Sequence, residues 1–233
     1  MKVCCIGDIH GTDKFLTCYN NICKNDNDCE KIIVFGDHFD PYKHISMNEM
    51  FEKYNEFIDI SQKDSRIVSL LGNHDLAYYI IRMDRTNRTN KFYSSKISTC
   101  IWSNLKDSYL CYRINDYLFS HAGVSKDWLD LIDKYKNANY VDKILNNYKG
   151  WTEPELCDLV SFYPFDKSYY GDDKHQGCTW IRPTTLVNCA IEGYNQVVAH
   201  TQVEEISKIK MDNKKDLWLI DTSGKPDYLT LNI

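Results

Sequence analysis

The sequence predicts an α/β fold in which parallel strands alternate with helices. Three apolar stretches in the first third have the composition of buried strands, namely Val3–Ile6, Lys31–Phe35 and Arg66–Leu71. Each stretch ends at a short glycine-containing polar motif. Repeated strand-then-helix units give parallel strands joined by right-handed crossovers. In such sheets a functional site forms beyond the carboxyl ends of the strands, which is where these motifs fall.

The size and charge of the chain limit the classes of function. Its 233 residues suit a single domain, because one core commonly reaches ~250 residues before it divides. We expect one domain over residues 1–233, with a helical and loop insertion at about residues 125–178. The net charge of −5 argues against general nucleic-acid binding, which usually needs a basic surplus to contact phosphates.

The sequence gives no reason to expect a membrane or a secretory pathway. No run approaches the ~18 apolar residues that span a bilayer, and no apolar signal region follows Met1. We therefore expect a cytoplasmic protein. The ten cysteines are scattered and form no CxxC pair, so most are expected to be buried as small apolar side chains in a reducing compartment.

Helices are expected after the first two strands. Thr12 is a candidate N-cap for a helix that continues through Ile22. A second helix has apolar residues spaced by three and four from Met47 to Ile58. A hairpin within residues 108–120 then places His121 at the end of its second arm.

The remainder of the chain is less regular. Three more helices are expected, at Asp127–Tyr135, Tyr140–Tyr148 and Glu153–Tyr163. A polar, tyrosine-rich loop covers residues 166–176, and a strand at Gln196–Ala199 ends on His200. Two antiparallel strands, Asp216–Ile220 and Tyr228–Ile233, close the chain around a turn at residues 223–226.

Carboxylate, imidazole and amide side chains gather at the ends of the expected strands. In GDIHG, Asp8 and His10 lie two positions apart just past a strand and can point the same way. The full set is Asp8, His10, Asp37, Asn73, His74, His121 and His200. This mixture of ligand types suits Mn, Fe, Zn or Ni better than Ca. It exceeds what one catalytic ion needs and therefore suits two metals.

Simpler interpretations exist for each of these residues taken singly. A lone histidine is more often packed or solvated than a ligand, and an aspartate at a strand end is often a helix N-cap. His38, His44 and His175 do not end strands, and we expect them to be surface histidines. For the others, the coincidence of four separate strand ends in one chain favours ligands.

The order of six motifs resembles that of a known family. GDIHG, GDHFD, GNHD, HAG, WIR and AHT, spread between Val3 and Asp221, resemble the metallophosphoesterases. Within them the chain is similar to the phosphoprotein (serine/threonine) phosphatases, especially the short bacterial and phage members, and to diadenosine tetraphosphatases. The resemblance implies two mixed β-sheets packed face to face with helices outside, an α/β/β/α sandwich around a two-metal centre.

The resemblance also implies roles for particular residues. Asp8 and His10 would hold the first metal, and Asp37 would bridge both. Asn73, His121 and His200 would complete the second. His74 would give a proton to the leaving group and Asp40 would orient it, while Arg182 would grip the phosphate, which Asn73 and His74 also contact.

Three positions depart from the family pattern. Pro41 stands where a second phosphate-gripping arginine is usual, which weakens the case for ordinary phosphoprotein substrates. Asp75 replaces the more usual glutamate, and Ala199 replaces a glycine. Gln202 occupies the place of the second histidine of GHxH, which favours a phosphatase over a nuclease or a cyclic-nucleotide phosphodiesterase.

The first hypothesis is therefore a two-metal phosphomonoester hydrolase acting on a phosphorylated protein or a small phosphate ester. Two divalent ions, with Mn preferred over Fe, Zn or Ni, would activate a bridging hydroxide as the nucleophile. The alternative is a hydrolase of dinucleoside polyphosphates or other nucleotides, supported by Pro41 and by three tyrosines that could stack on a base, Tyr163, Tyr169 and Tyr170. A catalytically inactive binding module is disfavoured because no ligand position is missing.

Overall fold

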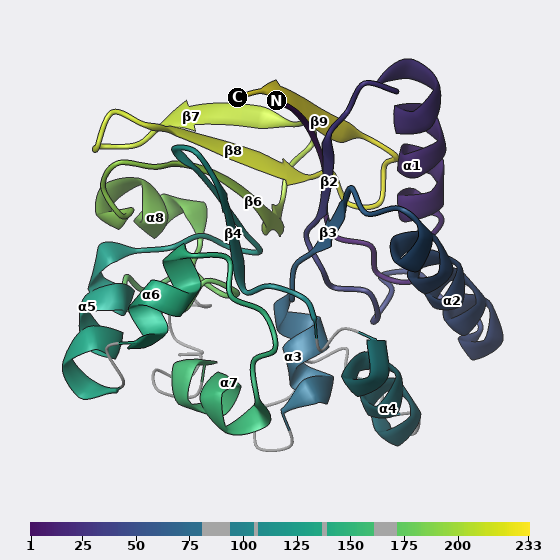
Figure 1. The fold of residues 1–233 in the computed structure, drawn as a ribbon, viewed down its shortest axis with the longest axis horizontal. Helices are drawn as coiled ribbons and strands as arrows, with labels where there is room; N and C mark the ends of the chain where they lie inside the picture. The colour runs from purple at the N-terminus through teal and green to yellow at the C-terminus, as the bar shows by residue number, and fades with distance from the viewer. Residues whose placement is uncertain (81–93, 105–106, 137–138, 161–171) are drawn as a thin grey trace.

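Two mixed sheets form the centre of the molecule. The structure, a computed structural model, describes residues 1–80, 94–104, 107–136, 139–160 and 172–233 (Figure 1). The first sheet has the order β3-β2-β1-β9 and the second β4-β5-β6-β8-β7. The strands of the first sheet are β1 (Lys2–Ile6), β2 (Lys31–Val34), β3 (Ile67–Ser69) and β9 (Tyr228–Asn232). Those of the second are β4 (Cys111–Ile114), β5 (Tyr117–Ser120), β6 (Asn195–Gln202), β7 (Ser207–Lys210) and β8 (Asp216–Asp221).

Parallel and antiparallel pairs occur in both sheets, as expected for the predicted class. Strands β1, β2 and β3 are parallel, and β9 runs antiparallel to β1. In the second sheet β5, β6 and β8 are parallel, while β4 and β7 pair antiparallel at the two edges. The carboxyl ends of β1, β2 and β3 therefore meet at one edge, which positions the loops that follow them.

Three hydrophobic clusters define the layers. The cluster between the sheets joins Val3, Cys5 and Ile33 from the first sheet to Phe119 and Val197 from the second. The alternate residues of β1, Cys4 and Ile6, face the other way and belong to the cluster that includes residues of the first helices. A third cluster lies beneath the helix that follows residue 182. The face-to-face sandwich with helices outside is confirmed.

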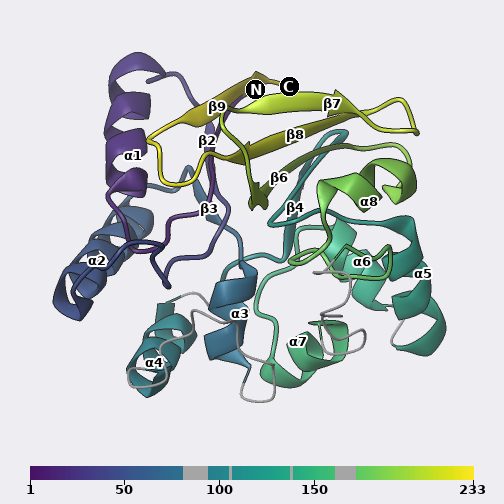
Figure 2. The same cartoon turned by 180° about the vertical axis from the view of Figure 1, so that it is seen from behind.

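Helices cover the outer faces of both sheets (Figures 1 and 2). On the first sheet lie α1 (Lys14–Asn25) and α2 (Met47–Lys63), and the shorter α3 (Asn73–Tyr79) and α4 (Ser94–Asn104) follow β3. The others are α5 (Lys126–Tyr135), α6 (Asn139–Leu145), α7 (Glu153–Val160) and α8 (Pro183–Cys189). Helices α5, α6 and α7 fall within residues 125–178, the span that we propose as an insertion. No helix in the described ranges is both long and apolar enough to cross a membrane.

Two expectations about local structure need correction. Helix α1 begins at Lys14, so Asp13 rather than Thr12 occupies the N-cap position, although Thr12 Oγ1 accepts the Lys14 amide at 3.3 Å. The last two strands do not pair with each other. Strand β8 pairs with β6 and β7, whereas β9 pairs with β1 and places Leu229 and Leu231 in the cluster between the sheets.

Other expectations are confirmed or fall outside the described residues. The hairpin of β4 and β5 and the helices near residues 127 and 140 are present. The expected helix at Glu153–Tyr163 is described only to Val160, and Tyr163, Tyr169 and Tyr170 lie outside the described residues. Six of the ten cysteines are buried, and all ten are free thiols.

Candidate metal and phosphate site

Loops from both sheets bring the expected ligands together at one place. Asp8 follows β1, Asp37 follows β2, and Asn73 opens α3 after β3. From the second sheet, His121 comes directly after β5, and His200 lies within β6. All of these side chains are buried, although they are polar or ionisable. Burying so many polar groups is unfavourable unless each one has a partner.

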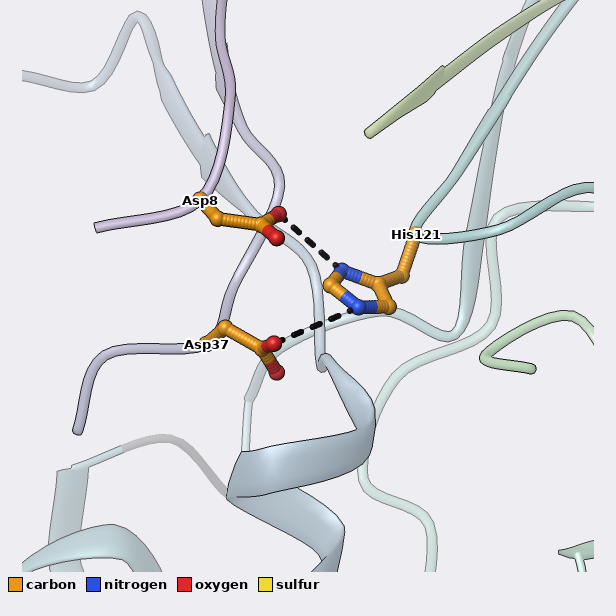
Figure 3. A group of neighbouring side chains, drawn as sticks. All are labelled: Asp8, Asp37 and His121. Atoms are coloured by element: carbon orange, nitrogen blue, oxygen red, sulfur yellow. Dashed lines mark ion pairs between the residues drawn. The ribbon is translucent and has the colours of Figure 1, made fainter. Parts of the chain in front are cut away.

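A carboxylate–imidazole cluster forms the centre of this site. Atoms of Asp8, Asp37 and His121 that could ligate a metal all lie within 4.8 Å of one another. His121 lies between the two carboxylates, with Nδ1 at 3.6 Å from Asp8 Oδ1 and Nε2 at 3.5 Å from Asp37 Oδ2 (Figure 3). His10 approaches the same pair, since its Nε2 lies 3.7 Å from Asp8 Oδ2 and 3.7 Å from Asp37 Oδ2.

Backbone carbonyls fix the orientation of two of the imidazoles. His10 Nδ1 lies 2.9 Å from Phe39 O, and His121 Nδ1 lies 2.7 Å from Phe35 O. A carbonyl can only accept, so each Nδ1 carries a hydrogen, and in the neutral form of each ring Nε2 presents its lone pair. In His121 that lone pair faces Asn73 Oδ1 at 2.9 Å. The His121 Nε2 lone pair and Asn73 Oδ1 are both acceptors, and both lie near carboxylates. Metal-binding sites have this arrangement, with backbone groups fixing the orientation of the ligands.

His200 completes the set with an atom that has no hydrogen-bond partner. Its Nε2 is buried and unpaired in the described part of the chain. Burial and the neighbouring His121, Arg182 and His74 hold the pKa of His200 well below its usual range. The ring is therefore neutral, which is the form that ligates a metal. Its centroid lies 5.0 Å from that of His121, so the two imidazoles belong to one cluster.

The charge of this cluster also fits divalent cations. Burial, followed by the neighbouring Asp221 and Asp37, raises the pKa of Asp8 well above its usual range in the absence of metal. Carboxylates that are this close and this buried need a positive counter-charge to remain ionised together. Carboxylate, imidazole and amide donors are the ligands of Mn, Fe, Zn and Ni. The residues at this site therefore fit divalent metal ions.

A hydrogen-bonded chain beside the cluster positions His74. His74 Nδ1 lies 2.7 Å from Asp40 Oδ2, and the Tyr78 hydroxyl donates to the other oxygen of Asp40. All three side chains are buried. The rings of His74 and His10 pack edge to face with centroids 5.3 Å apart. His74 is thus held next to the ligand cluster with its tautomer set by a carboxylate.

Arg182 approaches the site from the residue that precedes α8. Its Nη1 donates to Thr201 Oγ1 at 3.1 Å and to His200 O at 3.4 Å. Burial lowers the pKa of Arg182, and Tyr42, Asp172, Asp8 and Asp37 oppose that shift in this order. A half-buried guanidinium among these groups has the shape and charge to bind a phosphate.

Several residues of the site have a strained backbone. Four site residues have positive φ, namely His10 at 49°, Asp37 at 51°, Asp40 at 62° and His200 at 59°. Non-glycine residues rarely adopt this conformation, and each such residue costs about 1–3 kcal/mol. Gly72 allows the loops to approach closely, because a Cβ there would lie 2.1 Å from Asp37 Oδ1. Strain of this kind is typical of a functional site whose geometry the surrounding fold imposes.

The sequence interpretation missed the role of His38 and Asp75. His38 was expected at the surface but is 1% exposed, and its ring packs 4.6 Å from that of Phe57. Its Nδ1 lies 3.2 Å from Asp75 Oδ1. Asp75 also accepts hydrogen bonds from the amides of Asp37, His38 and Gly72. The two residues therefore hold the loop that carries Asp37.

The other two histidines expected at the surface differ from His38. His44 is exposed as expected, and His175 is half-buried.

Lys14 is the third residue that the sequence interpretation missed. Its side chain is fully buried, and its Nζ lies 3.8 Å from Asp221 Oδ1. Gly7 leaves room for the ammonium group, since a Cβ at that position would lie 3.2 Å from Lys14 Nζ. The positive charge of Lys14 partly offsets the influence of Asp221 on Asp8. The pattern of apolar residues along α1 does not predict that Lys14 is buried, because a charged side chain on a helix normally faces solvent.

The comparison with protein families agrees with this geometry. The chain belongs to the calcineurin-like phosphoesterase family, whose model matches residues 1–203. Together with the carboxylate–imidazole cluster, this membership identifies a metal-dependent phosphoester hydrolase. A search of curated proteins finds no match.

Several solved structures share the fold. A mutant of a cold-active protein tyrosine phosphatase aligns with a TM-score of 0.58 and 19% identity over 99% of this chain and 75% of that one. The cold-active protein-tyrosine phosphatase of a psychrophile, Shewanella sp., aligns at 0.53 and 18% over the same shares. A hypothetical protein from Pyrococcus horikoshii OT3 aligns at 0.50 and 11% over 100% and 87%. At these identities the likeness concerns the fold alone.

Proposed function

We propose that this protein hydrolyses phosphate monoesters with two divalent cations and with His74 as the proton donor. The observation that carries the proposal is the contact between the His74 ring and the His10 ring. The His74 ring, fixed by Asp40, packs against His10 of the ligand cluster. A proton donor placed beside a metal cluster suits the protonation of a leaving alkoxide.

The ligand roles follow the donor set. Asp8 and His10 would hold one cation, Asn73, His121 and His200 the other, and Asp37 would contact both, because its Oδ2 faces His10 and His121 at once. Bound divalent cations would supply an activated water and neutralise charge on the phosphoryl group. Mn is the preferred candidate, with Fe, Zn and Ni as alternatives.

His74 and Asp40 would control the proton. The Asp40 carboxylate accepts a hydrogen bond from His74 Nδ1 at one oxygen and from the Tyr78 hydroxyl at the other. A carboxylate at Nδ1 stabilises the imidazolium and directs Nε2 away from Asp40. The imidazolium can then donate its Nε2 proton to the departing oxygen.

Arg182 would orient the phosphate. Its Nη1 is anchored to Thr201 and His200, and an arginine fork offers further N–H donors to phosphate oxygens. The sequence has Pro41 in place of a second arginine, so Arg182 would be the principal anchor. Asn73 and His74, which adjoin the cluster, would contact the substrate as well.

The test compares two leaving groups with His74→Asn. A nitrophenolate departs largely unprotonated, whereas an alkoxide does not. We expect kcat on an alkyl phosphate to fall ~10²-fold or more, with a distinctly smaller loss on nitrophenyl phosphate and unchanged metal content. Asp40→Asn should give the same pattern more weakly, because it alters only the tautomer and charge of His74.

Equal losses on both substrates with metals still bound would contradict the role of His74 as an acid. Dinucleoside polyphosphates should be tested as substrates in the same assay, because they represent the competing substrate class. Hydrolysis of these compounds in preference to every monoester would replace the monoester proposal with the nucleotide one.

A further inference from the structure

An exposed tyrosine borders the ligand cluster. Tyr42 directly follows Pro41, on the segment that carries Asp37 and Asp40, and it is 51% exposed. Its ring meets the His10 ring edge to face, with centroids 4.6 Å apart and an interplanar angle of 76°. His10 itself is 4% exposed. Tyr42 therefore contacts a candidate ligand while much of its surface remains open to solvent.

The position of this tyrosine is more informative than its exposure. Scattered exposed apolar residues are normal on protein surfaces. The described residues include four large ones, namely Met1, Tyr42, Tyr135 and Ile209. Met1 begins the chain, Tyr135 ends α5 and Ile209 lies on the edge strand β7, whereas Tyr42 contacts His10. An aromatic surface is thus available at the site itself.

Arg182 and Trp180 add to the surroundings of Tyr42 at the site. Among the groups that oppose the lowering of the pKa of Arg182 by burial, Tyr42 has the largest effect, which agrees with its position against His10. Trp180, two residues before Arg182, is half-buried and packs edge to face on His200 with centroids 5.6 Å apart. Aromatic rings therefore contact candidate ligand histidines from both sheets, and Arg182 donates to the carbonyl of one of them, His200.

We propose that Tyr42 contacts the substrate and that the site prefers phosphate monoesters of aromatic alcohols, whose ring stacks on the exposed part of Tyr42. This inference rests on the proposed monoesterase function and adds its substrate class. In the reaction, the oxygen of water bonds to phosphorus and the ester P–O bond breaks. The aryl oxygen takes a proton, and the products are inorganic phosphate and a phenol.

The size of the preference follows from aromatic pairing. An offset-stacked or edge-to-face pair contributes about 0.5–1.5 kcal/mol beyond simple burial, which corresponds to a factor of about 2 to 10 in affinity. The ring of Tyr42, rather than its hydroxyl, supplies this contact. Tyr42→Phe should therefore keep the preference and Tyr42→Leu should remove it.

The experiment measures binding without turnover. Dissociation constants of phenylphosphonate and methylphosphonate are determined by calorimetry on the Mn-loaded protein for the wild type, Tyr42→Phe, Tyr42→Leu and the control Tyr135→Leu, which removes a similarly exposed tyrosine on α5. We expect the wild type, Tyr42→Phe and Tyr135→Leu to bind phenylphosphonate about 2 to 10 times more tightly than Tyr42→Leu does. Methylphosphonate should bind all four proteins alike.

The outcomes separate this inference from the function on which it rests. Equal affinity of phenylphosphonate for the wild type and Tyr42→Leu, with methylphosphonate still bound, would overturn the role of Tyr42 and leave the monoesterase proposal intact. Failure of both phosphonates to bind the metal-loaded wild type would overturn both. Tyr42→Gln, whose side chain is polar, replaces Tyr42→Leu if the latter folds poorly, and the same affinities are expected of it.

Discussion

Asp37 and Asp75 are two buried aspartates in neighbouring loops, and their surroundings differ sharply. Asp75 accepts hydrogen bonds from three backbone amides, at 2.8, 2.9 and 3.0 Å, and faces the His38 ring. Asp37 accepts the amide of His74 at Oδ1, at 2.8 Å. Its Oδ2 faces the Nε2 atoms of His10 and His121 at 3.7 and 3.5 Å.

The difference supports a structural role for Asp75 and the proposed ligand role for Asp37. Burial alone would raise the pKa of Asp75, but the His38 ring and the amide donors hold it below its usual range. The negative charge of Asp75 is thus stabilised by the protein. Asp37 lies beside a second carboxylate, Asp8, and accepts a single backbone amide, so bound cations would add positive charge that this cluster of carboxylates lacks.

The largest effect is expected from Asp37→Asn, which tests the proposed ligand role of Asp37. We expect metal affinity to fall by more than the ~10- to 100-fold that loss of an outer-shell partner costs, because Asp37 would contact both cations. Activity should fall with it, and chelation of the wild type should give the same loss. The metal-free variant should be at least as stable as the metal-free wild type, since repulsion from Asp8 is removed.

Metal content by mass spectrometry and melting temperature with and without Mn check this prediction. Asp130→Asn is the control, because it changes an exposed aspartate on α5. Unchanged metal content in Asp37→Asn would show that Asp37 is not a ligand.

The next effect is expected from Asp75→Asn, which tests the structural role of Asp75. The introduced amide NH₂ would face a backbone N–H, and the three donors would lose the charge that they stabilise. We expect a loss of about 3–5 kcal/mol in the free energy of unfolding, with or without metal. Urea unfolding of both forms measures it. A variant as stable as Asp130→Asn would show that Asp75 does not hold the loop.

Lys14→Met tests whether an internal cation supports the ligand cluster. Lys14 is buried beside Asp221, so its loss leaves that carboxylate without this ion pair and removes a positive charge that acts on Asp8. We expect a cost of about 3 kcal/mol in the metal-free protein and a smaller one when metal is bound, because the cations then supply positive charge. Lys126→Met, at an exposed lysine, is the control. An equal cost in both forms would limit Lys14 to packing.

The smallest effect is expected at Asp64, whose partner is a side chain outside the site. The hydrogen bond from Arg66 is the main cause that lowers the pKa of Asp64 to about 2. Since the folded pKa lies below the unfolded value of ~3.9, this pair stabilises the fold above about pH 4 and ceases to do so as the pH falls toward 2. Arg66→Gln should cost about 1–2 kcal/mol at pH 7 and less at pH 2.5. A cost that does not change with pH would contradict the ion-pair account.

Local patterns in the sequence predicted that the candidate ligand side chains would gather at one place. Asp8, Asp37, Asn73 and His121 each follow an apolar strand, and parallel strands bring such ends to one edge. His200 was expected to end its strand, but β6 continues to Gln202. Their role as metal ligands remains a proposal. The mixed sheets also follow the expectation drawn from the family resemblance. The features that could be predicted from the residues themselves are those that depend on a few neighbouring residues, such as a polar side chain at the end of an apolar strand.

The features that the sequence did not predict depend on distant contacts. His38 is buried because Asp75, 37 positions away, and Phe57 on α2 surround it. Strands β8 and β9 separate because β9 is held by β1 at the other end of the chain. Lys14 lies on a helix face that Asp221 makes favourable for a charge. No local periodicity encodes such pairings.

An anomalous difference map from Mn-soaked crystals tests the central claim most directly. The account predicts two peaks within the cluster, one beside Asp8 and His10 and the other beside Asn73, His121 and His200, with the Asp37 carboxylate touching both. Crystals of Asp75→Asn that diffract should keep peaks at the cluster, and those of Asp37→Asn should lose at least one. A map of the wild type with no peak near Asp37, or with one peak that Asp37→Asn leaves unchanged, would contradict the account.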